Sequence, residues 1–97
     1  MVQTIQTIIL PAGQQKIFFE KPHVLRRIFV SIRVLVPPEA WAESRISFDD
    51  PMFYSYYTLA GYSKCFEAKG EGIFQGSIWV VNNATGDLTY TYTEILI

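Results

Sequence analysis

Thirteen consecutive residues, 24 to 36, alternate in a pattern that constrains this chain more than any other feature. One parity carries mainly apolar, β-branched residues: Val24, Ile28, Val30, Ile32, Val34 and Val36. A period of two places alternate side chains on opposite faces of an extended strand, whereas a helix needs apolar residues three to four apart. In a helix, the arginines of this segment would also interrupt the buried stripe. We therefore predict a β-strand over 24–36.

Shorter segments of the same character occur along the rest of the chain. We predict further strands over residues 4–10, 16–20, 44–48, 53–59, 64–68, 73–81 and 88–97. Turn-forming residues separate them, and we expect a hairpin loop over 82–87 and a bulge or close backbone approach at Gly76. Only 37–43 favours helix, as a single turn after a proline.

About eight short strands with no long helix predict an all-β fold. We expect a two-sheet antiparallel sandwich of the jelly-roll kind, forming a single domain over residues 1–97. Its core should contain the apolar residues that share one face of their own strand: Ile28, Val30, Ile32, Ile46, Phe48, Ile78 and Val80.

The composition indicates a protein with a partner. Charged residues make up only 18% of the chain and aromatic residues 15%, whereas soluble domains average about 25% charged residues. So few charges leave apolar surface that a second protein surface should cover. The basic residues are scattered, which argues against a nucleic-acid partner. No apolar run is long enough to span a membrane and no signal-peptide pattern occurs, so we expect synthesis in the cytoplasm.

No catalytic motif is present. His23 is the only histidine and Cys65 the only cysteine, so a metal cluster or a nucleophile with its base lacks partners. Asp49-Asp50 precedes a proline and is more typical of a turn than of a calcium site. Glu67 and Glu71 could form a glycosidase pair, but exposed carboxylates on strands are far more common. We predict no catalytic residue, no cofactor, no metal and no enzymatic activity.

Two segments are apolar on both faces of their predicted strands. In 53–59, Phe53 and Tyr57 share one face while Tyr54 and Tyr56 share the other. Only one face of a strand can meet the core of a two-layer fold, so the other should be exposed or covered by a second chain. By this reasoning the interface candidates are Phe29, Leu35, Tyr54, Tyr56, Tyr57 and Trp79.

The segments 66–83 and 88–95 have a characteristic order: a strand punctuated by glycine, a strand containing Trp79, a polar loop and a last strand with alternating threonines. In this order the chain resembles small jelly-roll proteins of bacteriophage particles, namely capsid decoration (cement) proteins and related head or tail appendages. The resemblance implies a non-enzymatic virion structural protein. It also implies a homo-oligomer, a trimer by preference, that attaches to the major capsid protein or another virion protein, and a location in the virion.

A carbohydrate-binding β-sandwich module is the alternative. Tyr54, Tyr56, Tyr57 or Trp79 could then stack on sugar rings. The virion hypothesis predicts aromatic surface buried between subunits. The sugar-binding hypothesis predicts a monomer with an exposed, planar aromatic strip.

Overall fold

The described residues form eight β-strands. The computed structural model describes residues 2–20, 27–38, 41–49, 55–62, 64–73 and 76–96. The strands are β1 (Val2–Leu10), β2 (Gln15–Glu20), β3 (Ile28–Leu35), β4 (Trp41–Asp49), β5 (Ser55–Tyr62), β6 (Cys65–Gly72), β7 (Ser77–Asn82) and β8 (Leu88–Leu96). The predicted all-β class is confirmed, and each predicted strand overlaps an observed one.

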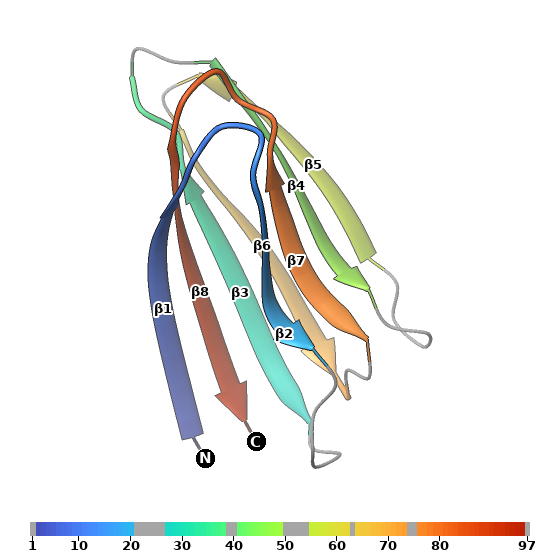
Figure 1. The fold of residues 1–97 in the computed structure, drawn as a ribbon. Coiled ribbons are helices and arrows are strands. Elements are labelled where there is room, and N and C mark those ends of the chain that lie inside the picture. Colours follow the sequence, from blue (N-terminus) through green and yellow to red (C-terminus); the bar gives the residue numbers. More distant parts are fainter. Residues whose placement is uncertain are drawn as a thin grey trace.

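The strands form two four-stranded antiparallel sheets (Figure 1). Sheet A has the order β1-β8-β3-β6 and sheet B the order β2-β7-β4-β5. Along the chain, β2 lies between β1 and β3, the pair β4 and β5 between β3 and β6, and β7 between β6 and β8, so the chain passes back and forth between the sheets. Two Greek keys produce this arrangement, which is the jelly-roll topology. The predicted jelly-roll sandwich is therefore confirmed. Both ends of the described chain lie at one end of sheet A, where Val2 pairs with Leu96.

Even-numbered residues of β3, β4, β7 and β8 face the space between the sheets. In β3, Ile28, Val30, Ile32 and Val34 are at most 2% exposed. Ile46, Phe48, Ile78 and Val80 oppose them from sheet B, as the antiparallel register requires. All seven predicted core residues are buried, so the register read from the alternation is correct.

The predicted hairpin loop at 82–87 is wrong. β7 belongs to sheet B and β8 to sheet A, so this segment crosses between the sheets. The buried Asn82 fixes the crossing: its Nδ2 donates to Leu10 O at 2.8 Å and to Gly86 O at 3.1 Å, and its Oδ1 accepts from Ala84 N at 2.8 Å. Its backbone N–H also donates to Gln14 O at 2.9 Å. One side chain thereby joins the β7–β8 crossing to the β1–β2 turn.

Two smaller expectations also need correction. The predicted helical turn over 37–43 does not extend to its end, because Trp41, Ala42 and Glu43 already belong to β4; residues 39 and 40 lie outside the described part. Gly76 sits in a bend before β7. The irregular pairing in sheet B lies instead in β2, between Ile17 and Phe19.

Polar and aromatic contacts hold the sheets together. The buried hydroxyls of Ser44 in β4 and Tyr90 in β8 lie 2.7 Å apart. The rings of Phe18 and Tyr92 stack with centroids 4.9 Å apart and planes at 6°. The hydroxyl of Tyr92 has no hydrogen-bond partner among the described residues. Its burial raises the pKa of Tyr92, and the nearby charge of Glu94 raises it further.

Candidate assembly surface

The outward face of sheet A is one of the two sheet faces that point away from the core. Since even-numbered residues point inward, the odd-numbered residues of β1, β8 and β3 point outward. They are Gln3, Ile5, Thr7 and Ile9 in β1, Thr89, Thr91, Thr93 and Ile95 in β8, and Phe29, Ser31, Arg33 and Leu35 in β3. Arg33 is the single charged residue among these outward positions of the three described strands.

Exposed aliphatic side chains stand at one end of this face. Ile9, Thr89, Leu35 and Cys65 lie in one row across the four strands. Ile9 is 69% exposed and Leu35 56%, and Ile5 on the same face is 61% exposed. Isolated exposed aliphatic residues are ordinary, but a group on a nearly uncharged face marks an interaction surface.

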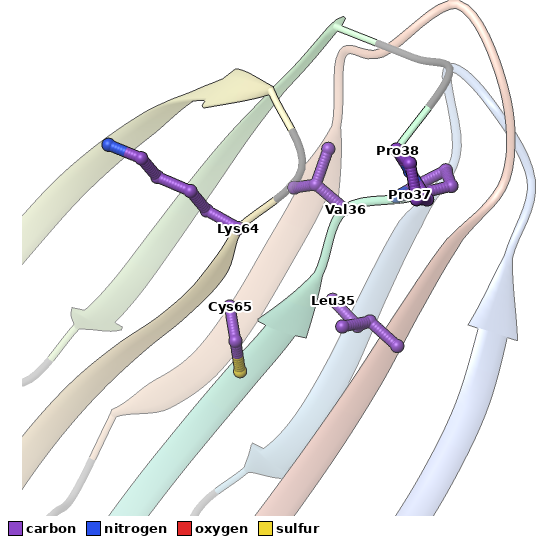
Figure 2. A pocket seen from close by; sticks show the side chains of 6 residues that line it. All are labelled: Leu35, Val36, Pro37, Pro38, Lys64 and Cys65. Carbon is purple, nitrogen blue, oxygen red and sulfur yellow. The ribbon is translucent and has the colours of Figure 1, made fainter.

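The same end of sheet A is hollowed. A depression of about 360 Å³ is lined by Leu35, Val36, Pro37, Pro38, Lys64 and Cys65 (Figure 2). A second, of about 180 Å³, is lined by Arg33, Leu35, Cys65, Thr89 and Thr91. Leu35 and Cys65 thus line both depressions. Shallow depressions of this kind suit the insertion of apolar side chains from another protein better than the burial of a small molecule.

β6 gives this face a charged border. Its outward residues include Glu67, Lys69 and Glu71, which face Arg33, Ser31 and Phe29 of β3. Ser31 Oγ donates to Glu67 Oε1 at 2.7 Å, and Lys69 Nζ lies 3.7 Å from the same oxygen. An apolar centre with a charged rim is the usual anatomy of a protein–protein interface.

The outward face of sheet B carries aromatic residues. Trp41 and Tyr62 are register partners at the end of β4 and β5 and are 40% and 64% exposed. Further along, Trp79 of β7 lies opposite Ile17 of β2, which is 46% exposed. Ser47, between β5 and Trp79 on this same face, is nevertheless fully buried. Neighbouring side chains therefore already cover the face at Ser47.

The predicted interface residues separate into several groups. Phe29 and Leu35 lie on the outward face of sheet A, and Trp79 on that of sheet B. Tyr57 shares the inward face of its partner Ile46, and its ring makes a T-shaped contact with that of Phe48 at a centroid distance of 5.8 Å and an angle of 74°, while the residue remains 36% exposed. Tyr54 and the side chain of Tyr56 lie outside the described part. The structure brings Phe29 and Leu35 to one face, and their interface role stays a prediction.

Seven large, exposed apolar residues of the described part were not among the predicted interface candidates: Val2, Ile5, Ile9, Ile17, Trp41, Tyr62 and Ile73. A usable signal existed for Ile5 and Ile9, because they share a parity opposite to that of Ile8 and Leu10. The sequence alone did not say which parity of 4–10 faces the core. Trp41 fell in the segment predicted as a helical turn, where strand parity does not apply.

The reactive side chains of the described strands β3 and β6 contact one another in pairs. Cys65 is exposed, and Arg33 Nη2 donates to its sulfur at 3.5 Å. Glu71 pairs with Arg27 at 2.8 Å, and the contacts of Glu67 are those given above, so both carboxylates have structural partners. Within the described ranges no group of three histidine, cysteine or acidic residues could hold a metal ion. His23 and Asp50 lie outside those ranges. The described part contains no helix long and apolar enough to cross a membrane.

Comparisons with known proteins gave a match by structure but none by sequence. No family model matches the chain, and no curated protein matches it. Among solved structures, it is similar to a protein from Bacillus endospore appendages, which form a family of disulfide-linked pili. The TM-score is 0.52 with 13% sequence identity, over 99% of this chain and 88% of the other. This likeness establishes a shared β-sandwich fold.

Proposed function

We propose that the chain is a non-enzymatic structural subunit that assembles with copies of itself into a larger protein structure. The observation that carries the proposal is the outward face of sheet A, where exposed Ile5, Ile9 and Leu35 occupy a nearly uncharged surface with a charged border. Covering apolar surface is the main favourable contribution to association. The shared fold with an appendage protein supports a polymerising role.

The proposal also concerns the kind of larger structure that the subunit joins. The resemblance of residues 66–95 to phage decoration proteins supports attachment to a capsid or another virion protein, as a trimer. The likeness to an endospore appendage protein supports a pilus-like polymer.

The linkage between subunits should be non-covalent. The Bacillus appendages are disulfide-linked pili. Within these 97 residues there is one cysteine, Cys65. A single thiol can join two copies by one disulfide but cannot extend a covalent chain beyond a pair. A polymer built from these 97 residues would therefore be held by non-covalent contacts between their surfaces.

Light scattering and negative-stain electron microscopy test the proposal. We expect species larger than the 11.1 kDa monomer and particles or filaments of uniform width. Replacing Ile9 and Leu35 together by serine should shift the protein toward monomer. Ile17→Ser is the matched control, because Ile17 is an exposed isoleucine on the other sheet. Equal loss of assembly in the control would contradict a specific role for sheet A.

Sugar binding is the second candidate, and the pair Trp41 and Tyr62 favours it. These aromatic side chains are neighbours and both are exposed, as a stacking platform requires. A glycan array with the wild-type protein and Tyr62→Ala distinguishes the candidates. Binding that Tyr62→Ala abolishes, by a protein that scatters light as a monomer, would support the sugar-binding module instead.

A further inference from the structure

Among the strands that the structure describes, none pairs with the outer edge of β1. β1 pairs with β8 along its whole length, from Val2–Leu96 to Leu10–Leu88, and it is the end strand of sheet A. Alternate backbone N–H and C=O groups of its nine residues therefore point away from the sheet. A row of such groups is a template for an added strand.

We propose that β1 pairs in antiparallel orientation with β1 of a second copy, so that two copies of sheet A become one eight-stranded sheet. This inference rests on the proposed self-assembly and names the edge that carries it.

β1 lacks the features that usually protect a sheet edge. Lysine, proline, bulges and short length keep edge strands from pairing with other chains. β1 contains no charge, proline or glycine. It is rich in residues that favour strands: Val2, Thr4, Ile5, Thr7, Ile8 and Ile9.

The other three edges are less suited to pairing. β6 presents Glu67, Lys69 and Glu71 and contains two glycines. β2 has six residues, carries Lys16 and is irregular after Ile17. β5 is uncharged, but it contains Gly61, where an added Cβ would lie 3.1 Å from the ring of Phe66. Glycine weakens a strand and marks a close approach of the chain.

The exposed side chains of β1 indicate a second copy as the partner. If the inward faces of both copies lie on the same side of the joined sheet, only residues of equal parity can lie opposite each other across the two β1 strands. The two-fold axis then passes between the two copies of one residue. An axis at Thr7 places Ile5 of each copy opposite Ile9 of the other and the two Thr7 residues opposite each other. Pairs of β-branched residues and threonine pairs are favourable across strands. This register covers the isoleucines that are 61% and 69% exposed in one copy.

Ile5→Lys tests the edge. Each two-fold interface would then contain two lysines opposite apolar residues, and we expect self-association to weaken by roughly tenfold or more. Ile73→Lys is the matched control, since Ile73 is an exposed isoleucine outside the strands. Circular dichroism should show an unchanged β-sheet spectrum in both variants, because both side chains are exposed.

Cysteine cross-linking tests the register. In a Cys65→Ser background, Thr7→Cys places two thiols at the two-fold axis, where the Cα atoms of paired strands are about 4.5–5.5 Å apart and a disulfide can form. Gln3→Cys is the control, because its two copies would be eight residues apart, about 26 Å. Mild oxidation should give covalent dimers of the Thr7 variant only.

The outcomes separate this inference from the proposed function. An oligomer that tolerates Ile5→Lys and does not cross-link through Thr7→Cys overturns the β1 pairing and leaves self-assembly in place. A protein that stays monomeric at hundreds of micromolar overturns both. Cross-linking through Gln3→Cys in place of Thr7→Cys overturns the proposed register.

Discussion

Two buried tyrosines in β8 should respond in opposite ways to the same substitution. Tyr90 and Tyr92 point into the core and are 0% and 2% exposed. The hydroxyl of Tyr90 lies 2.7 Å from Ser44 Oγ, whereas that of Tyr92 has no hydrogen-bond partner among the described residues. Phenylalanine removes only the hydroxyl in each case. The comparison therefore isolates the value of the hydrogen bond between the sheets.

The expected magnitudes follow from the two environments. Tyr90→Phe removes a buried hydrogen bond and leaves Ser44 Oγ with only its 3.4 Å contact to Val81 O, which should cost about 1–2 kcal/mol. Tyr92→Phe removes a desolvated and unpaired hydroxyl, so the free energy of unfolding should stay the same or rise by up to about 1 kcal/mol. For a domain of this size, 1 kcal/mol corresponds to roughly 4–8 °C in Tm.

Urea denaturation of both variants, followed by circular dichroism at one low protein concentration, measures the difference directly. A fixed concentration is needed because self-association would add to the apparent stability. We expect the midpoint of Tyr90→Phe to fall and that of Tyr92→Phe to stay or rise. The reasoning is refuted if Tyr92→Phe destabilises the protein as much as Tyr90→Phe does.

Three further predictions concern the core, the crossing between the sheets and pH. Val30→Ala should lower the free energy of unfolding by about 1–3 kcal/mol through lost burial and a cavity, measurable by thermal unfolding, and an unchanged Tm would contradict its central place. Asn82→Ala removes three side-chain hydrogen bonds and should cost about 3 kcal/mol, whereas the exposed Asn83→Ala should cost little in the same assay. Burial raises the pKa of Tyr90 and of Tyr92 above the ordinary 10.0. As the pH rises through about 10, these tyrosines ionise in the unfolded protein before they ionise in the folded one, so the free energy of unfolding should stay constant below about pH 10 and fall above it. Urea midpoints measured from pH 8 to 12 should show this fall, and a flat profile would contradict it.

The core could be predicted from the sequence because its signal is local. In β3, the alternation of Ile28, Val30 and Ile32 with Phe29 and Ser31 fixes both the strand and the face that is buried. A slip of one residue would expose the whole apolar set, so a single run of sequence determines the register.

The strand order and the crossings could not be predicted in the same way. Residues 82–87 have the composition of a tight turn whether they join neighbours in one sheet or cross to the other sheet. The choice depends on non-local pairing, in which β8 lies between β1 and β3. The buried Asn82 at the start of the crossing is needed to donate a hydrogen bond to Leu10 O. Because Leu10 is far from Asn82 in the sequence, the local pattern does not reveal this role.

The candidate surface was predictable only in part. Leu35 and Phe29 were found because β3 has a clear buried parity from which the outward one follows. Ile5 and Ile9 were not, since β1 has apolar residues on both parities. The status of β1 as an edge strand, which makes those residues important, follows from the sheet order and not from the strand itself.

Sedimentation of the wild-type protein over a concentration range from about 1 to several hundred micromolar tests the central claim most directly. Self-assembly predicts a mass that rises with concentration above the 11.1 kDa of one chain, beginning with pairs if β1 is the first contact. A mass that stays at that of the monomer across the whole range would contradict the account of this chain as an assembling structural subunit.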